Sequence, residues 1–320
     1  MMSSADMQSI PVLTVVIPCY NENEVLPETN KRMAALLDQL TASGKIAATS
    51  QVMYVDDGSK DGTWEMIKSF HAVSARVAGL KLSANRGHQT ALMAGLFAAA
   101  GDVVISVDAD LQDDLAAIEQ MLDAHRNGSE IVFGVRKQRT ADTMFKRNSA
   151  QTYYRLLKLL GVNVVFNHAD YRLLGRRALE ALKQYSEVNL FLRGIVPLLG
   201  FKSTTVFYDR AERFAGESKY PLRKMLVLAF DGITSFTAFP LRLISIMGVL
   251  VSLASAVMIG WVLWVKLFTS EALPGWASSV IPIYFLGGLQ LLSIGVLGEY
   301  VAKIYAETKR RPRYFIEETV

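Results

Sequence analysis

Two long apolar stretches near the end of the chain place the strongest limit on its fold. Leu241–Val265 and Val280–Val301 each contain a single charged residue. A helix needs about 20 apolar residues to cross the core of a bilayer, so each stretch is long enough to span a membrane. Trp261, Trp264 and Trp276 flank the stretches, as is common at membrane interfaces. The alternative is a pair of buried core helices in a water-soluble protein, and the length and low charge disfavour it.

Basic residues around the two stretches predict their orientation. Those before the first stretch and after the second are Lys219, Arg223, Lys224, Arg242, Lys303, Lys309, Arg310, Arg311 and Arg313. The connecting loop holds only Lys266 and Glu271 as charged residues. Because cytoplasmic flanks carry the excess of Lys and Arg, we expect both chain ends in the cytoplasm and the loop outside. Glycines in the second stretch favour close helix packing, which allows a homo-oligomer.

The rest of the chain is too polar for a pure membrane bundle, since 20% of all residues are charged. We therefore expect a water-soluble part joined to a membrane part. The formal net charge of +4 does not indicate a nucleic-acid partner. The single cysteine, Cys19, excludes an internal disulfide and a four-cysteine zinc site.

The first 110 residues alternate between strand and helix patterns. Continuous apolar runs such as VLTVVIP suit strands buried on both faces, and segments such as EVLPETNKRMAALLDQLTAS have helical spacing. This alternation predicts an α/β fold, a doubly wound and mostly parallel sheet with helices on both faces. Residues 115–215 are less regular, with one helix pattern and the strand-like EIVFGVR.

Acidic and polar clusters follow three of the predicted strands, at Asn21-Glu22, Asp56-Asp57 and Asp108-Ala109-Asp110. Ligands of such sheets bind outside the carboxyl ends of the strands. Strand alternation would point Asp108 and Asp110 the same way, where two carboxylates can hold a divalent cation with diphosphate oxygens. The alternative for this cluster is a solvated acidic turn. Asp56-Asp57 could accept hydrogen bonds from a nucleobase or ribose, or simply form a turn.

Seven segments, taken in order and spacing, resemble family 2 inverting glycosyltransferases of the GT-A fold. The first four are VVIPCYNENE, YVDDGSKDGT, NRGHQTALMAGL and VDADLQDD. The later AERFAGESKY, FPLRLISIMG and GVLGEYVAKIYAETKRRPRY are similar to polyisoprenyl-phosphate glycosyltransferases, above all the bactoprenol glucosyltransferases. The resemblance covers nearly the whole chain. The QxxRW signature of processive polysaccharide synthases does not occur.

The resemblance implies a donor site built on the acidic clusters. Asp108, Asp110 and Gln112 would hold Mg²⁺ or Mn²⁺, and Arg136 would meet the phosphates of the sugar nucleotide, for which a planar guanidinium is suited. An exposed arginine at a strand end is the alternative for Arg136. Asp108, Asp110 and Arg136 are the implied catalytic residues. The residues implied to bind the nucleotide sugar are Pro18, Tyr20, Glu22, Asp56, Asp57, Asp108 and Arg136. Asp170 and Arg172 match an active-site turn of the family by resemblance alone.

The acceptor implied by the resemblance is a lipid phosphate. Arg147, Arg213, Ser218 and Lys219 are predicted to bind it, and non-specific contact with anionic lipids is the alternative. A phosphate monoester has a second pKa of about 6, so it is ionised near neutral pH and needs no protein base. We therefore expect a single displacement with inversion, and interpret His88 and His168 as structural. Asp113 and Asp114 are interpreted as turn residues.

The expected protein is a metal-dependent glycosyltransferase of the bacterial inner membrane. It would move a hexose, glucose from UDP-glucose, onto undecaprenyl phosphate at the cytoplasmic face. A flippase and a periplasmic transferase would then use the lipid-linked sugar for O-antigen or other envelope glycans. The alternatives are another sugar on the same carrier, mannose or formamido-arabinose, and a non-catalytic scaffold that binds lipid or nucleotide.

These expectations divide the chain into six parts. They are a cytoplasmic GT-A catalytic domain (1–215), an interfacial helix (216–240), a first membrane helix (241–267), a periplasmic loop (268–279), a second membrane helix (280–303) and a basic cytoplasmic tail (304–320). For 216–240, a helix packed on the soluble domain is the alternative.

Overall fold

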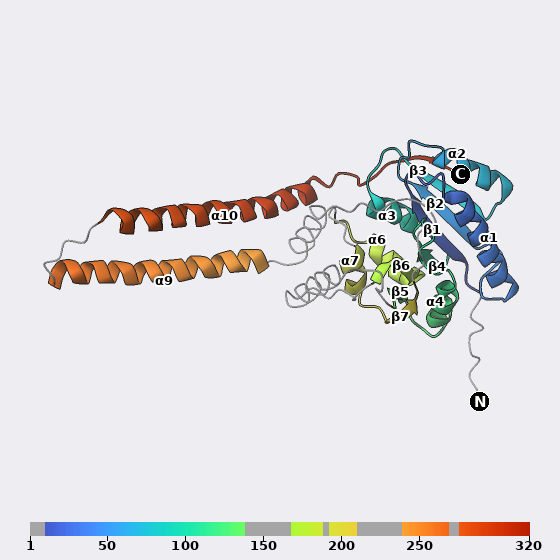
Figure 1. Cartoon of the computed structure of the whole chain (residues 1–320). Helices are drawn as coiled ribbons and strands as arrows, with labels where there is room; N and C mark the ends of the chain where they lie inside the picture. Colours follow the sequence, from blue (N-terminus) through green and yellow to red (C-terminus); the bar gives the residue numbers. More distant parts are fainter. Residues whose placement is uncertain (1–9, 138–167, 188–191, 210–238, 269–274) are drawn as a thin grey trace, which may run out of the picture. The chain divides into compact units, whose positions relative to one another are not determined.

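The computed structural model describes residues 10–137, 168–187, 192–209, 239–268 and 275–320 (Figure 1). The chain divides into two compact units. The first contains the described residues up to 209 together with Arg311–Val320, and the second contains the described residues of Leu222–Arg310.

The first unit is built from strands and helices that alternate along the chain. Its strands are β1 (Leu13–Cys19), β2 (Gln51–Asp56), β3 (Val77–Leu82), β4 (Val103–Ser106), β5 (Ile131–Arg136), β6 (His168–Gly175), β7 (Ser203–Tyr208) and β8 (Ile316–Thr319). Its helices are α1 (Leu26–Ala42), α2 (Thr63–Val73), α3 (His88–Ala98), α4 (Ala117–Arg126), α6 (Arg176–Lys183) and α7 (Leu192–Leu198).

The strands described form one sheet in the order β7-β5-β6-β4-β1-β2-β3-β8. Strand β1 pairs in parallel with β2 and β4, β2 with β3, and β5 with β7. Strands β6 and β8 run antiparallel to their neighbours. The sequence of β1, LTVVIPC, is buried throughout, as expected for a strand covered on both faces. The predicted α/β fold with a mostly parallel sheet is confirmed.

Helices cover both faces of this sheet (Figure 1). On one face, apolar side chains of α1, α2 and α4 join those of the central strands in one buried core, which includes Leu37, Ile67 and Met121. On the other face α3 packs against β1 and β2. A Cβ atom on Gly95 of α3 would lie 2.4 Å from Val16 Cγ1, so glycine allows this close approach. The faces are thus closed, and the carboxyl edge of the sheet is left for ligands.

The end of the chain returns to this sheet. In the predicted tail, 304–320, helix α10 continues to Lys309 and the last residues form β8, which pairs antiparallel with β3. The backbones of Gly79 and Val320 exchange two hydrogen bonds, of 2.8 and 2.9 Å. The last ten residues, Arg311–Val320, are therefore part of the first unit.

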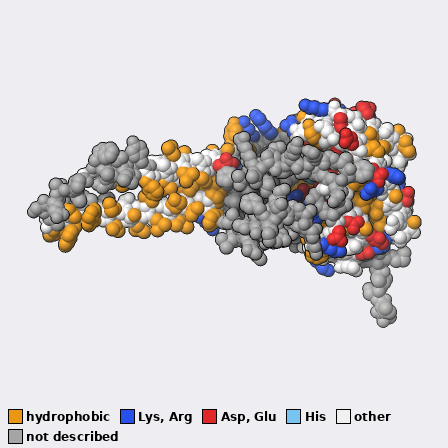
Figure 2. Space-filling model, viewed as in Figure 1, with side chains coloured by type: hydrophobic (Ala, Val, Ile, Leu, Met, Phe, Trp, Pro, Cys, Tyr) orange, Lys and Arg blue, Asp and Glu red, His pale blue; other side chains and the backbone are white. Residues whose placement is uncertain are grey.

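The second unit contains two long helices, α9 (Phe239–Phe268) and α10 (Trp276–Lys309), which contact each other. Two windows, Phe239–Val265 and Phe285–Lys309, are long and apolar enough to cross a membrane, with mean hydropathies of 2.3 and 1.4. Figure 2 shows apolar side chains over the described surface of these helices. Neither window is buried within the described chain, which disfavours two core helices of a soluble protein. The helix predicted for 216–240 lies outside the described residues except for its last two positions.

Candidate active site

The carboxyl ends of β1, β2, β4, β5 and β7 meet at one edge of the sheet, where the antiparallel β6 begins. This edge gathers most of the residues singled out by the sequence, because parallel strands end together. They are Pro18, Tyr20, Glu22, Asp56, Asp57, Asp108, Asp110, Gln112, Arg136, Asp170 and Arg172. The four residues predicted to bind the acceptor phosphate, Arg147, Arg213, Ser218 and Lys219, lie outside the described residues.

Asp108 and Asp110 follow β4 rather than belonging to it. The strand ends at Ser106, so the expectation that both lie on a strand is wrong. The alternation of burial continues beyond the strand, however: Val107 and Ala109 are buried, while Asp108 and Asp110 are partly exposed. The carbonyl of Ala109 accepts a hydrogen bond from Thr29 of α1 at 3.0 Å. The apolar half of the turn is thus anchored in the core and leaves both carboxylates at the sheet edge.

The backbone turns sharply just after these carboxylates. Leu111 has a φ of 56°, a left-handed backbone conformation that is unfavourable for residues other than glycine. The turn brings the backbone N–H of Gln112 to Asp110 Oδ1, at 3.2 Å. Such strained positions are concentrated at functional sites. Gln112 itself is buried, with 8% of its surface exposed, so its side chain belongs to the wall of the site.

The charges around Asp108 favour a bound cation. Burial raises the pKa of Asp108 to about 6 although His88 lowers it, and the charges of Asp113, Asp170 and Asp110 add to the rise. Mg²⁺ in proteins is commonly held by one or two carboxylates together with substrate phosphates. The described residues contain no group of three His, Cys, Asp or Glu placed to hold a metal. Asp108 and Asp110 are the two carboxylates that the chain would supply to such an ion.

Asp56 and Asp57 are neighbours in sequence but differ in their contacts. The carboxylate of Asp57 accepts hydrogen bonds from the backbone N–H groups of Arg86 and Gly87, at 2.7 and 2.8 Å. Asp56 accepts one from the backbone of Ser59 at 3.2 Å, and its buried Oδ2 has no hydrogen-bond partner among the described residues. Burial raises the pKa of both carboxyls. Asp57 therefore holds the loop before α3, while Asp56 is fully buried and holds the backbone turn at Ser59.

A cavity of about 190 Å³ opens beside this pair. Its lining residues are Pro18, Cys19, Tyr20, Glu22, Asp57, Asn85, Gly87, His88 and Ala91. Four of the five residues predicted to bind the nucleotide sugar from the first two strands thus line one cavity. Tyr20 is 41% exposed there, which suits a ring that packs on a ligand rather than in the core.

A second group of charges surrounds Asp170, at the start of β6. Its carboxylate pairs with the buried guanidinium of Arg172 and with Arg193 of α7, whose Nη2 lies 3.2 Å from Oδ2. Burial would raise the pKa of Asp170, but Arg193 and Arg172 hold it well below its usual range. His88 Nε2 lies 3.5 Å from Asp108 Oδ1 and 3.7 Å from Asp170 Oδ2. Asp170 is therefore an ionised part of the site, and His88 links it to the turn that carries Asp108.

Arg136 is held by residues that the sequence analysis did not assign to the site. Its Nε donates to the hydroxyl of Tyr208 at 3.2 Å, and its Nη2 lies 3.6 Å from Asp113 Oδ1. The same carboxylate oxygen accepts a hydrogen bond of 2.6 Å from Tyr208. Asp113 is buried, so its interpretation as a mere turn residue is wrong. Asp114 does form a turn, since its carboxylate accepts from the N–H of Ala116 at the start of α4.

The site residues missed by the sequence analysis are His88, which was interpreted as structural, Asp113, Arg193 and Tyr208. Arg193 carried one signal, because it is the single charge in the apolar segment LFLRGIVPLL. His88 carried another, because it lies within a motif. Tyr208 gave none, since a tyrosine that ends a strand is ordinary in a core.

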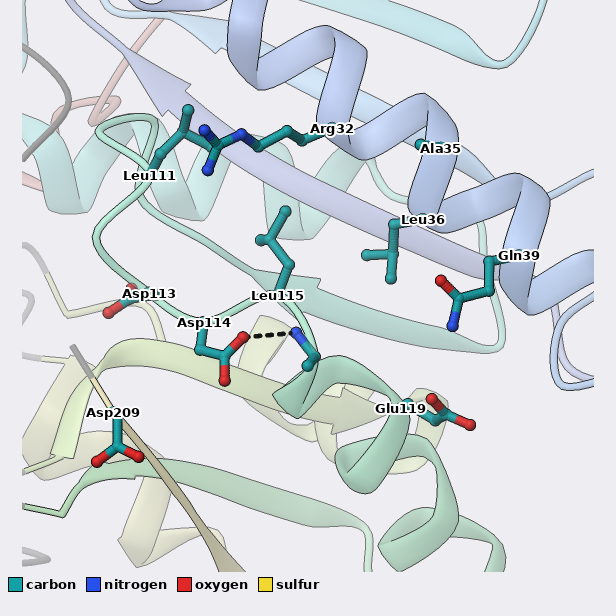
Figure 3. Close-up of a pocket in the computed structure, with 11 residues that line it drawn as sticks. Arg32, Ala35, Leu36, Gln39, Leu111, Asp113, Asp114, Leu115, Glu119 and Asp209 are labelled. Carbon is teal, nitrogen blue, oxygen red and sulfur yellow. Dashed lines mark hydrogen bonds between the residues drawn. The ribbon is translucent and has the colours of Figure 1, made fainter. Parts of the chain in front are cut away.

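A larger cavity of about 580 Å³ lies on another side of the turn that carries Asp113. Figure 3 shows Asp113 and Asp209 at one side of it, and Gln39 and Glu119 at the other. Its charged lining is mostly acidic, with Arg32 as the one basic side chain among the described residues that line it.

Comparison with known proteins identifies the family of this chain. Residues 14–183 match Glycosyl transferase family 2. Uncharacterized glycosyltransferase YkoT of Bacillus subtilis (strain 168) is 50% identical over 312 residues, which cover 97% of this chain and 92% of YkoT. The prophage bactoprenol glucosyl transferase homolog of Escherichia coli (strain K12) is 35% identical over 306 residues, 95% of this chain and 98% of that protein.

A similar solved structure is mannosyltransferase PcManGT from Pyrobaculum calidifontis in complex with GDP-Man and Mn²⁺. It is 17% identical, with a TM-score of 0.45, and the match covers 92% of this chain and 84% of that one. At this level the likeness carries no argument about ligands. The family is shown by the match of residues 14–183 and by relatives that align over nearly their whole length: the chain belongs to glycosyl transferase family 2.

Proposed function

We propose that this chain transfers glucose from UDP-glucose to undecaprenyl phosphate at the cytoplasmic face of the bacterial inner membrane. The observation that carries the proposal is the meeting of Asp108, Asp110 and Arg136 at one sheet edge, in a chain with two candidate membrane helices. Carboxylates that hold a cation and an arginine beside them suit a nucleotide diphosphate. Helices that cross a membrane suit a lipid acceptor.

The identity of the sugar and of the carrier rests on a relative. The E. coli protein named prophage bactoprenol glucosyl transferase homolog matches 306 residues, or 95% of this chain, which is too much to leave out either candidate membrane helix. Bactoprenol is undecaprenol, so the same acceptor is the first choice here. Mannose and formamido-arabinose are the competing sugars, because few pocket residues decide between them.

The nucleotide would bind with its base near Asp56. The unpartnered Oδ2 of this residue is a buried acceptor, and a buried acceptor without a donor is unfavourable by about 1–3 kcal/mol. The N3–H group of uracil is a suitable donor. Tyr20 is exposed in the adjoining cavity, where its ring could pack on the base.

Asp108 and Asp110 would hold Mg²⁺ or Mn²⁺ through carboxylate oxygens, with Gln112 beside them. When bound, the ion supplies positive charge that stabilises the leaving diphosphate. The chain adds Arg136, whose guanidinium can donate two parallel hydrogen bonds to phosphate oxygens. Charge stabilisation of the leaving group is commonly the largest contribution in reactions of this type.

The acceptor supplies its own nucleophile. An oxygen of the lipid phosphate attacks C1 of the sugar, and the bond from C1 to the diphosphate breaks with inversion. No proton has to be removed, because the phosphate is ionised above its second pKa of about 6. Asp170 is therefore not needed as a base. Its carboxylate stays ionised because it pairs with Arg172 and Arg193. Arg147, Arg213, Ser218 and Lys219 stay predictions for the acceptor site.

The test uses the full-length protein, purified in detergent, with undecaprenyl phosphate and a panel of radiolabelled sugar nucleotides. We expect label from UDP-glucose in the organic phase, and far less from GDP-mannose or a UDP-linked formamido-arabinose. Preference for another sugar would replace glucose but keep the reaction. Transfer from none of them would leave the non-catalytic scaffold as the better reading.

A further inference from the structure

Arg136, Tyr208 and Asp113 form a cluster drawn from three elements: β5, β7 and the turn after β4. Arg136 and Tyr208 are partners in the parallel pairing of β5 and β7, so their side chains point to the same face of the sheet. Tyr208 and Asp113 are 2% and 3% exposed, whereas the Arg136 side chain is 23% exposed. In this cluster Tyr208 and Asp113 are therefore buried, while the guanidinium of Arg136 is partly accessible.

The hydrogen bonds in this cluster run in one direction. Burial raises the pKa of Tyr208 and the charge of Asp113 raises it further, so the hydroxyl keeps its proton. The hydroxyl donates a hydrogen bond of 2.6 Å to Asp113 Oδ1, and its oxygen accepts a hydrogen bond of 3.2 Å from Arg136 Nε. A guanidinium has five N–H donors in a rigid plane. Fixing Nε on Tyr208 and Nη2 near Asp113 sets that plane while other N–H groups stay available.

We propose that Tyr208 and Asp113 are positioning residues that orient the Arg136 guanidinium toward the donor diphosphate. The inference rests on the proposed function, in which Arg136 meets those phosphates. Parallel hydrogen bonds to phosphate need the arginine in one plane, and an arginine held there in advance loses less side-chain entropy on binding. Tyr208 thus acts on the substrate through Arg136, without touching it.

Tyr171 offers a matched comparison. It packs edge-on against Tyr208, with ring centroids 5.1 Å apart, and its hydroxyl donates to the backbone carbonyl of Asp114 at 3.0 Å. Both hydroxyls therefore fasten the same turn, from the two strands that flank β5. Only Tyr208 also contacts Arg136. Loss of either hydroxyl removes one hydrogen bond to the turn. Loss of the Tyr208 hydroxyl also removes a partner of Arg136, and loss of the Tyr171 hydroxyl does not.

The experiment compares Tyr208→Phe, Tyr171→Phe, Arg136→Ala and the double variant Tyr208→Phe/Arg136→Ala in the full-length protein. The Kd for UDP-glucose is measured by calorimetry with Mn²⁺, together with KM and kcat where turnover permits, and with the melting temperature. We expect Tyr208→Phe to weaken UDP-glucose binding by about tenfold. Tyr171→Phe should lower the melting temperature to a similar extent while the Kd stays within about twofold of the parent.

The double variant separates positioning from loop stability. In the Arg136→Ala background, the added Tyr208→Phe change should have little further effect on Kd, because its target is gone. Equal effects of Tyr208→Phe and Tyr171→Phe on Kd, or a tenfold effect that persists without Arg136, would overturn the inference. If Arg136→Ala itself binds UDP-glucose normally, the proposed role of Arg136 fails, and the inference with it. If Arg136→Ala weakens binding and Tyr208→Phe does not, only the inference fails.

Discussion

The indole nitrogen of Trp64 donates a hydrogen bond of 2.7 Å to Glu318 Oε2, although 254 positions separate the two residues. Trp64 lies on α2, and Glu318 lies on β8, the last strand of the sheet. The bond fastens the end of the chain to the unit that holds the donor site. The segment after the second candidate membrane helix therefore contributes to the stability of this unit.

Replacement of Glu318 tests this contribution. Because the Trp64 side chain is nearly buried, Glu318→Ala leaves its N–H without a partner, and we expect a loss of about 1–2 kcal/mol in the free energy of unfolding. Glu317→Ala is the matched control, since Glu317 pairs with Lys81 at 3.2 Å at the surface, where an ion pair contributes about 0–1 kcal/mol. Thermal unfolding in detergent measures both. Equal losses would argue against a specific role of the Trp64 contact.

Gly58 and Gly44 give a second test, because they share a backbone conformation but not their surroundings. Their φ values are 67° and 66°. A Cβ on Gly58 would lie 2.7 Å from the backbone of Ala84 and Asn85, while one on Gly44 would meet nothing within 4 Å. We expect Gly44→Ala to cost about 1 kcal/mol from the left-handed conformation alone. Gly58→Ala should cost clearly more and weaken UDP-glucose binding, since it pushes the loop before α3 away from Asp57.

The two aspartates at the end of β2 should respond differently to the same substitution. In Asp57→Asn, the amide NH₂ faces one of the two backbone N–H groups that the carboxylate accepted from, so one hydrogen bond is lost. We expect the free energy of unfolding to fall by about 2 kcal/mol. Asp56→Asn removes a buried charge and keeps an acceptor for Ser59, so the melting temperature should hold or rise. It should nevertheless weaken UDP-glucose binding about tenfold. Melting curves and calorimetry on both variants check this, and a reversed pattern would exchange the two roles.

The raised pKa of Asp108 predicts how metal binding depends on pH. The folded protein releases the proton of Asp108 at about 6, above the ordinary value of 3.8, and only the ionised carboxylate binds a cation well. The affinity for Mn²⁺ should therefore fall about tenfold per pH unit below about pH 6 and level off above about pH 7. Without metal, the folded state binds more protons than the unfolded state between these pKa values, so stability should decrease as pH rises through them.

Mn²⁺ titrations followed by electron paramagnetic resonance, without nucleotide or lipid, isolate this effect from the phosphates of the substrates. Asp108→Asn is the control, because it has no proton to release and should show weak binding at every pH. An affinity for Mn²⁺ in the parent protein that does not change between about pH 5 and about pH 7 would remove Asp108 from the metal site.

Some of this fold could be predicted because its signals are local. Continuous β-branched runs such as LTVVIPC predicted the central strands, and the parallel order placed Asp56 and Asp108 at one edge. Strand β8 could not be predicted, because its residues, IEET, are all exposed and mostly polar. What holds it is pairing with β3 and the packing of Val320 on Gly79, and neither leaves a pattern in the sequence of the strand.

The same distinction applies to the site. Local spacing was enough to single out Asp108 and Asp110, whereas the contacts of Asp57 depend on a loop about thirty positions away. Asp113 looks like a turn residue until Tyr208, 95 positions later, is placed beside it. Residue type and spacing thus identify groups that would touch a ligand, and fail for groups that hold those residues in place.

The most direct test of the proposed function is the transfer of radiolabelled glucose from UDP-glucose to undecaprenyl phosphate by the purified full-length protein. Asp110→Ala removes a carboxylate from the proposed metal site. Asp114→Ala is its control, because the Asp114 carboxylate accepts from the N–H of Ala116 at the start of α4 in the same turn. We predict a lipid-linked product with inverted configuration for the parent and for Asp114→Ala, and a loss of at least about 100-fold for Asp110→Ala. Full activity of Asp110→Ala, or a product with retained configuration, would contradict the account.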